Sequence, residues 1–187
     1  MMILVTGGSG SGKSAFAEQK LCELGTGRRV YVATMIPSDG ESKKKIDAHI
    51  HRRAGKEFVT IEKYSGLGGL VPAEDDRITD LNGEINDGIL LPEDSVLLED
   101  LSNLTANEMF VYGGQGNIID DIKKTSAYVR NLVIVTNEIF SEAMVYEGET
   151  ADYMRLLGRI NRKLSEAADE VYEVVYGIPV CLKGADR

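Results

Sequence analysis

The sequence is poor in the residues that mark several classes of protein. Among its 187 residues are no tryptophans, two histidines, four prolines and two cysteines, Cys22 and Cys181. The cysteines form no CxxC pair and have no Cys/His spacing, which argues against a disulfide framework and against a zinc site. This pattern of cysteine use is typical of cytoplasmic proteins, so we expect a cytoplasmic location.

Positive charge and long apolar runs are also scarce. The chain has 21 Lys and Arg residues against 30 Asp and Glu residues, a formal net charge of −9. A nucleic-acid partner is therefore not expected, because phosphate neutralisation needs a basic surface. The apolar start, 1–5, is short and lacks a basic leader, so no signal peptide is expected, and composition indicates neither a membrane span nor wholesale disorder.

Short apolar runs alternate with amphipathic stretches along the whole chain. This order predicts an α/β fold, a mostly parallel, doubly wound sheet covered by helices, and the length favours a single domain over 1–187. The segment 64–94 is rich in glycine and acids and predicts an irregular connection with one short helix. The expected strands are 2–6, 29–34, 58–61, 96–100 and 132–136, with an antiparallel C-terminal pair at 171–175 and 178–182, and the expected helices are 13–24, 43–53 and 150–168.

The strongest motif follows the first predicted strand and leads into the first helix. Its residues have Walker A spacing, in which glycines let the backbone wrap phosphates and the helix N-terminus attracts the same anion. Lys13 would bring positive charge to the β- and γ-phosphates, and the Ser14 hydroxyl would be a ligand for Mg²⁺. The motif is Gly7, Gly8, Ser9, Gly10, Ser11, Gly12, Lys13 and Ser14.

A Gly/Ser-rich loop that merely precedes a helix is the alternative. The strand before the loop, the helix after it and two carboxylates at the end of a later strand favour nucleotide binding instead. Those carboxylates are Glu99 and Asp100. Either could hold Mg²⁺ at the carboxyl edge of the sheet, and Asp100 could equally cap a helix that begins near Asn103.

The two histidines, His49 and His51, lie in the predicted helix 43–53. A two-residue step on a helix turns by about 200°, so both rings cannot face one phosphate. An imidazole beside a bound triphosphate could form a covalent nucleotidyl intermediate, with Arg52 and Arg53 binding phosphate oxygens. From spacing alone, an exposed basic helix end is the commoner meaning of such a cluster.

Taken together, these residues resemble one family along nearly the whole chain. It is the bifunctional adenosylcobinamide kinase / adenosylcobinamide-phosphate guanylyltransferase family of cobalamin assembly, whose fold is a P-loop α/β domain. The resemblance includes the P-loop, His49 and the short runs 97–99 and 135–138. Its most specific part is the stretch Gly158-Arg159-Ile160-Asn161, which continues to Ile178.

The resemblance implies two activities and a set of site residues. A P-loop kinase would phosphorylate the aminopropanol hydroxyl of the corrinoid adenosylcobinamide, using GTP or ATP with Mg²⁺. Transfer of GMP from GTP would follow through a GMP-histidine at His49. The family usually assembles as a trimer. Beyond the P-loop, the implied nucleotide-binding residues are Ala33, Thr34, Ile50, His51, Arg52, Arg53, Glu62 and Glu99, with Ser14 and Glu99 at the metal.

A physical argument supports the two glutamates that the family pattern brings in. Guanine presents N1–H and N2–H donors on one edge, and a carboxylate accepts both, whereas adenine lacks this pair. Without the family pattern, Glu62 would be an ordinary exposed acid at a strand end.

Two other functions fit the P-loop alone. One is a kinase for a different small molecule, in which His49 is structural and ATP suffices. The other is a nucleotide-sensing regulatory module that has lost its chemistry. The sequence departs from the family pattern at Gly10, where arginine is common, and at Ile139-Phe140, where Val-Gly is common.

Overall fold

The computed structural model describes residues 1–25, 27–37, 40, 55–72, 90–114, 117–141 and 146–184. The predicted helix 43–53 lies outside these ranges, and so does 73–89 of the predicted irregular connection. The described part of that connection contains one short 3₁₀ helix, η1 (Leu67–Leu70).

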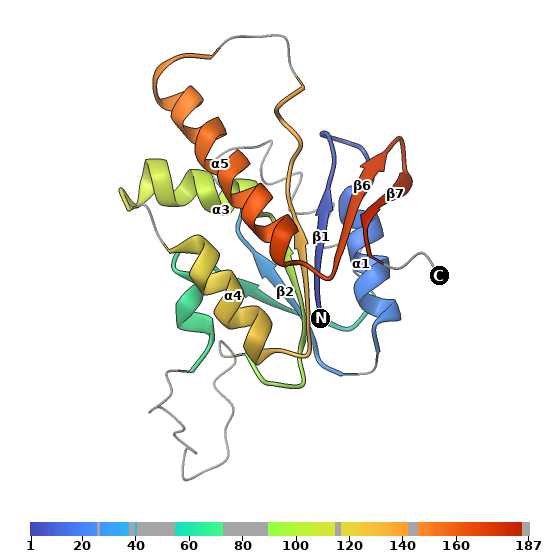
Figure 1. Cartoon of the computed structure of the whole chain (residues 1–187). Coiled ribbons are helices and arrows are strands. Elements are labelled where there is room, and N and C mark those ends of the chain that lie inside the picture. The colour runs from blue at the N-terminus through green and yellow to red at the C-terminus, as the bar shows by residue number, and fades with distance from the viewer. Residues whose placement is uncertain are drawn as a thin grey trace.

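A seven-stranded sheet forms the centre of the molecule (Figure 1). Its order is β3-β2-β4-β5-β1-β6-β7; neighbouring strands are parallel except for the antiparallel hairpin of β6 and β7. This confirms the predicted mostly parallel sheet with an antiparallel C-terminal pair. The strands are β1 (Met2–Thr6), β2 (Arg29–Ala33), β3 (Phe58–Glu62), β4 (Ser95–Glu99), β5 (Asn131–Val135), β6 (Glu170–Val175) and β7 (Ile178–Lys183).

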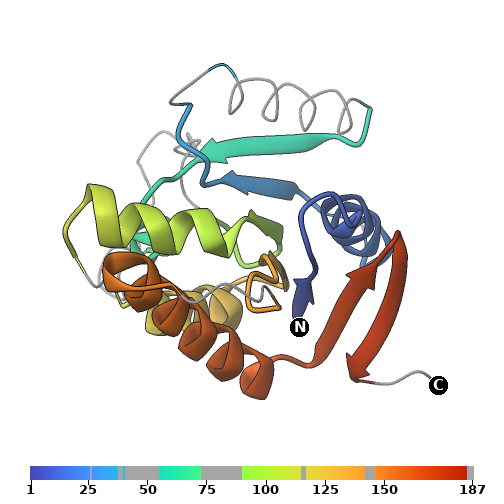
Figure 2. The same cartoon turned by 90° about the horizontal axis from the view of Figure 1, so that it is seen from above.

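Helices cover both faces of the sheet. Figure 2 shows α1 (Lys13–Glu23) on one side and α3 (Leu101–Ala106) and α5 (Gly148–Ala167) on the other. The side of α3 and α5 also carries α4 (Ile118–Tyr128). A π-helical turn, η2 (Asn107–Val111), continues α3. No helix in the described ranges is long and apolar enough to cross a membrane.

The two faces of the central strands bury separate apolar clusters, because successive side chains on a strand point to opposite sides. Leu4, Leu98 and Ile134 pack toward α3, α4 and α5. Ile3, Leu97 and Val133 pack toward α1. The uninterrupted apolar runs of the sequence are therefore the central parallel strands, which are buried on both faces. The loops that follow these strands meet at one edge of the sheet, the edge formed by the carboxyl ends.

Most element boundaries agree with the sequence-based expectations to within two residues. The helix expected near Asn103 begins instead at Leu101, because the Asp100 side chain caps it by accepting the Asn103 backbone N–H at 2.6 Å. Helix α4 was not predicted. Its signal is the buried spacing of Ile118, Ile122 and Thr125, steps of four and three residues.

Candidate nucleotide site

The loop between β1 and α1 wraps as the Walker A motif predicts. Gly12, the residue before the helix, has a left-handed backbone with φ of 91°, which favours glycine. A Cβ at Gly7 would lie 2.6 Å from Ser11 Oγ and 2.7 Å from the backbone oxygen of Val174. The loop therefore needs glycine at its first position because its backbone packs too closely for any side chain.

The C-terminal hairpin closes against this loop. The backbone N–H of Gly177, in the β6–β7 turn, donates to the backbone oxygen of Ser11 at 2.8 Å. A Cβ at Gly12 would lie 3.4 Å from the Cα of Gly177. The backbone N–H of Glu138, after β5, donates to the Gly7 oxygen at 3.0 Å. The phosphate loop is therefore held by the backbone of the segments that follow β5 and β6.

Lys13 is the charged group of the loop, and it is buried. Its Nζ donates to the backbone oxygen of Gly8 at 3.2 Å. Burial lowers the pKa of Lys13, while the nearby charges of Asp100 and Glu99 act in the opposite direction. The ammonium group thus lies within the curl of the loop, near the acidic end of β4.

Ser14 and Glu99 meet directly. The Ser14 hydroxyl donates to Glu99 Oε1 at 2.6 Å, which joins the first turn of α1 to the last residue of β4. A hydroxyl and a carboxylate oxygen are the hard oxygen ligands that Mg²⁺ prefers, and Mg²⁺ commonly takes few protein ligands together with substrate phosphates. The pair therefore fits the metal role predicted for Ser14 and Glu99.

Asp100 caps a helix, one of its two predicted alternatives. Its carboxylate accepts the Asn103 N–H at 2.6 Å and the side-chain amide of Asn137 at 3.1 Å. Burial raises the pKa of Asp100, and these hydrogen bonds together with Lys13 oppose that effect. The charge of the Asp100 carboxylate also acts on Lys13 and opposes the lowering of its pKa. One side chain therefore both caps α3 and contributes to the electrostatics of the site.

Thr34 ties the end of β2 to the same strand end. Its hydroxyl donates to the Asp100 oxygen at 2.8 Å and accepts the Asp100 N–H at 2.7 Å. Its own N–H donates to the Glu99 oxygen at 3.0 Å. The predicted Ala33-Thr34 turn is therefore fixed beside the two carboxylates.

Glu62 lies farther out, at the end of the edge strand β3. Glu62 and Glu99 both pair in register with Ala33, one on each side, so their Cα atoms are two strand spacings apart, about 10 Å. Register partners point to one face of the sheet, and for Glu99 that is the face of α1. Glu62 is exposed, and its Oε2 accepts the Tyr64 hydroxyl at 2.7 Å.

The structure brings the P-loop together with Thr34, Glu99 and Asp100, while five predicted residues lie outside the described ranges. These are His49, Ile50, His51, Arg52 and Arg53. Within the described residues, no group of three or more His, Cys, Asp or Glu side chains is arranged to hold a metal ion.

Several polar residues around the site were absent from the predicted set. Asn137 binds Asp100, and Asn107 donates its side-chain amide to the backbone oxygens of Thr34 and Tyr64 at 2.8 and 3.1 Å. Asn161 accepts the hydroxyl of Thr136 at 3.0 Å, so a residue of the family-like stretch supports the end of β5. The position of Asn137 just after an apolar strand was the available signal for that residue.

Solved structures with a similar fold include one of an archaeal protein. It is the flagellar accessory protein FlaH from Methanocaldococcus jannaschii, with a TM-score of 0.50 and 13% sequence identity, covering 98% of this chain and 78% of that protein. At this identity the likeness concerns the fold alone.

Comparison of sequences is more specific. Two curated relatives, each named bifunctional adenosylcobalamin biosynthesis protein CobU, come from Salmonella typhimurium and Escherichia coli. Each is 32% identical over 98% of this chain and 100% of the relative. The family model described as cobinamide kinase / cobinamide phosphate guanyltransferase matches residues 3–182. With its P-loop, its Ser14–Glu99 pair and this match over nearly its whole length, the chain belongs to the cobinamide kinase / cobinamide phosphate guanyltransferase family.

Proposed function

We propose that this chain phosphorylates the aminopropanol hydroxyl of adenosylcobinamide and then transfers GMP from GTP to the new phosphate. The observation that carries the proposal is the phosphate site built by Lys13, Ser14 and Glu99 in a chain of this family. The curated relatives are named as bifunctional proteins of adenosylcobalamin biosynthesis, which supports both steps.

In the kinase step, the P-loop holds the nucleotide triphosphate. The corrinoid hydroxyl oxygen bonds to the γ-phosphorus, the bond to the bridging oxygen breaks, the nucleoside diphosphate leaves and the hydroxyl proton is released. Lys13 neutralises charge on the transferring group, and the backbone N–H groups of the loop orient the phosphates. The hydrogen bonds to Gly7 and from Gly177 keep this cradle in shape before the nucleotide arrives.

Ser14 and Glu99 are the residues that would hold Mg²⁺. The ion would supply positive charge to the phosphate oxygens. The Ser14 hydroxyl donates to Glu99, and this bond keeps the two oxygen ligands adjacent. Their preorganisation reduces the side-chain ordering that binding would otherwise require.

In the guanylyl step, an imidazole nitrogen of His49 attacks the α-phosphorus of GTP and pyrophosphate leaves. An oxygen of the corrinoid phosphate then displaces the histidine, so the N–P bond breaks and GDP-linked cobinamide forms. Arg52 and Arg53 would bind the phosphate oxygens, with Ile50 and His51 completing the nucleotide contacts. These roles rest on the family resemblance and on the chemistry of imidazole.

The two glutamates divide between the ends of the nucleotide. Glu99 is buried and bonded to the phosphate-loop serine, which favours the metal and phosphate end. Glu62 is exposed at the outer edge of the sheet, which favours the base. A carboxylate there would accept the N1–H and N2–H donors of guanine and would reject adenine.

Labelling tests the transfer mechanism. GTP labelled at the α-phosphate should leave label on the wild-type protein that is labile in acid and stable in alkali. We expect His49→Ala to abolish the label, whereas His51→Ala, which removes a proposed nucleotide contact but keeps the proposed nucleophile, should still become labelled at saturating GTP. Label that survives in His49→Ala would overturn the assigned nucleophile, and wild-type protein without label would overturn the guanylyl half of the function.

We further propose that the enzyme acts in the cytoplasm as a homo-oligomer, a trimer as the family resemblance implies. An apolar outer strand supports self-association. The side chains of Ile178, Val180 and Leu182 alternate along β7, which pairs with β6 alone among the described strands, and all three are exposed. Exposed apolar edge strands of this kind favour pairing with another chain.

A further inference from the structure

We propose that Tyr64 and Asn107 determine the guanine preference of the site by holding the Glu62 carboxylate in place. Tyr64 follows β3, which ends at Glu62, and Asn107 contacts the backbone of both Tyr64 and Thr34. The inference rests on the function proposed above, in which Glu62 binds the base. In this arrangement Tyr64 orients the carboxylate that binds the base, and the buried Asn107 in turn fixes Tyr64.

The first contact is between the two side chains at the end of β3. The Tyr64 hydroxyl donates to Glu62 Oε2 at 2.7 Å, although Glu62 is exposed to solvent. An exposed glutamate normally samples several rotamers, and a ligand must order it. Each carboxylate oxygen accepts more than one hydrogen bond, so the bond from Tyr64 restricts the group and leaves acceptor capacity for a base.

The hydroxyl remains a donor over a wide range of pH. Its hydrogen bond to Glu62, followed by burial and the charge of Glu62, raises the pKa of Tyr64 to about 12. The Tyr64 hydroxyl therefore keeps its proton and can donate to Glu62 throughout the neutral range of pH. It supports a constant orienting role, with no switch near neutral pH.

The second contact fixes the backbone of Tyr64. Asn107 is buried at the first position of η2, and its side-chain amide donates to the Tyr64 backbone oxygen at 3.1 Å and to the Thr34 backbone oxygen at 2.8 Å. An amide nitrogen has two N–H donors, so these two bonds use both of them. Asn107 therefore joins the loop after β3 to the loop after β2.

The same chain of contacts reaches the phosphate site. Thr34 is bonded through its hydroxyl and its N–H to Asp100 and Glu99, and Glu99 accepts the Ser14 hydroxyl. A continuous series of hydrogen bonds thus runs from the phosphate loop to Glu62. It fixes the spacing between the groups assigned to the phosphates and the group assigned to guanine, which lie about two strand spacings apart.

A nucleotide-binding comparison tests the role of Tyr64. Dissociation constants are measured for GTP, for ITP, which lacks the 2-amino group, and for ATP, using wild type and Tyr64→Phe. We expect Tyr64→Phe to weaken GTP binding by about five- to tenfold while ATP binding changes less than about twofold, since only the orientation of the base-binding carboxylate is lost. The GTP-over-ITP preference should shrink as well.

Tyr128→Phe, at the last residue of α4, is the matched control and should bind all three nucleotides as wild type does. Equal weakening of GTP and ATP by Tyr64→Phe, or an unchanged GTP affinity, would overturn the proposal. If wild type shows no preference for GTP over ATP, the assignment of Glu62 to guanine in the proposed function fails first. The two failures are therefore distinguishable.

The role of Asn107 is tested by coupling. We expect Asn107→Ala to lower thermal stability and also to reduce the GTP-over-ATP ratio. In the double variant with Tyr64→Phe, the ratio should fall little further than in Asn107→Ala alone, because both residues act through Glu62. Additive effects on the ratio would contradict this pathway, even if the variant is destabilised. Thermal melts of each variant verify folding at the assay temperature.

Discussion

The direct bond between Ser14 and Glu99 is the smallest unit on which the phosphate chemistry depends. It places the first turn of α1 against the last residue of β4 at 2.6 Å. Burial lowers the pKa of Lys13, and the charge of the Glu99 carboxylate partly offsets this lowering. Replacing Glu99 by glutamine would remove this negative charge and keep the shape of the side chain. The substitution would therefore weaken the binding of a divalent ion and change the electrostatic potential at Lys13 together.

We expect Glu99→Gln to reduce the kinase turnover number by about 100-fold, since an amide still accepts the Ser14 hydroxyl but no longer offers a negative ligand. Initial rates of diphosphate formation with cobinamide, measured across Mg²⁺ concentrations, check this. Glu93→Gln, an exposed residue just before β4, is the control. A turnover number within about twofold of wild type would remove Glu99 from the metal role.

Single side chains also show where the sequence is informative about the site. Lys13 and Ser14 were predicted because the glycine spacing around them is recognisable without any distant contact. Asn107 could not be predicted in the same way, because its amide joins backbone oxygens 73 and 43 residues away in the chain. Such a role depends on the packing of η2 against two loops, and no local pattern of residues encodes that packing.

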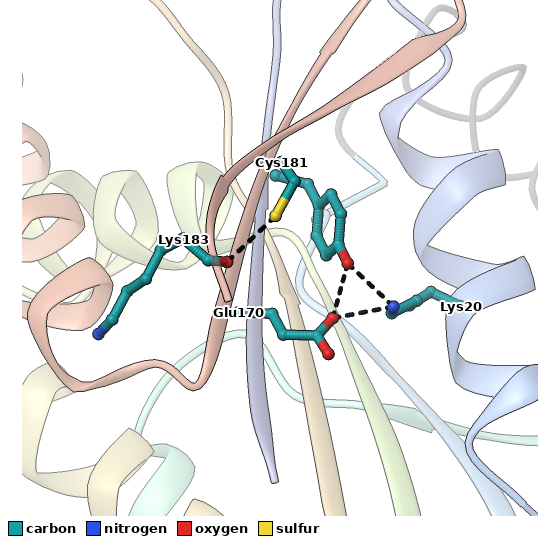
Figure 3. Close-up of polar contacts among 5 residues, drawn as sticks. Lys20, Glu170, Cys181 and Lys183 are labelled. Carbon is teal, nitrogen blue, oxygen red and sulfur yellow. Dashed lines mark hydrogen bonds and ion pairs between the residues drawn. The ribbon is translucent and has the colours of Figure 1, made fainter. Parts of the chain in front are cut away.

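At the scale of elements, α1 is held at both ends. Its first turn binds β4 through Ser14, and its last turn binds β6 through Lys20 (Figure 3). Lys20 Nζ lies 2.8 Å from Glu170 Oε2 and 3.0 Å from the Tyr172 hydroxyl, which itself donates to Glu170 at 2.8 Å. This cluster keeps the helix that carries the P-loop at a fixed position on the sheet.

The cluster predicts a pH-dependent contribution to stability. Burial alone would raise the pKa of Glu170, but Lys20 and Tyr172 outweigh it and hold the pKa below the usual 4.5. Burial alone would lower the pKa of Lys20, but Glu170 and Tyr172 raise it to about 12. The Glu170 contribution is therefore present above its unfolded pKa and lost in acid, and that of Lys20 is lost only as the pH rises through about 12.

Glu170→Gln tests this sign. We expect it to melt below wild type between about pH 5 and 10, with the difference in Tm disappearing as the pH falls into the acid range. Thermal melts of both proteins at a series of pH values measure the difference, and Glu173→Gln on the same strand is the control. A gap that stays constant into acid would show that the ion pair is not its cause.

Elements were predicted well where their signal is local. The buried strands β1, β4 and β5 are continuous apolar runs, and α5 has apolar residues at helical spacing along most of its length. Helix α4 was not predicted because most of its residues are polar, among them Asp120 and Lys123. Its buried positions nevertheless keep helical spacing. The start of α3 lies two residues before the predicted one because the extended backbone of Asp100 makes it the capping residue, an alternative that the sequence left open.

At the scale of the whole molecule, β7 is the outer strand at one edge of the sheet (Figure 1). Its side chains Ile178, Val180 and Leu182 form an exposed apolar row. The central strands are covered by α1 on one face and by α3, α4 and α5 on the other. The opposite edge, β3, carries Glu62 and serves the proposed base site. The two edges thus have different proposed roles, one in self-association and one in nucleotide binding.

We expect a double variant, Ile178→Lys with Leu182→Lys, to shift the protein from the proposed trimer to a monomer, because charged side chains on an edge strand oppose pairing between chains. Light scattering coupled to size-exclusion chromatography gives the mass. Ala127→Lys, on the exposed side of α4, should leave the mass of the wild-type protein unchanged. A monomeric wild type, or a double variant of unchanged mass, would exclude this edge as the contact.

The position of β1 within the sheet has a consequence for how the protein is made. Among the described strands its neighbours are β5 and β6, which begin at Asn131 and Glu170, so β1 leaves the ribosome long before either of them. The turn at Gly177 completes the flank of the phosphate loop later still. Until this turn has been made the phosphate loop lacks one flank, so we expect the chain to bind nucleotide tightly only after residue 177 has left the ribosome.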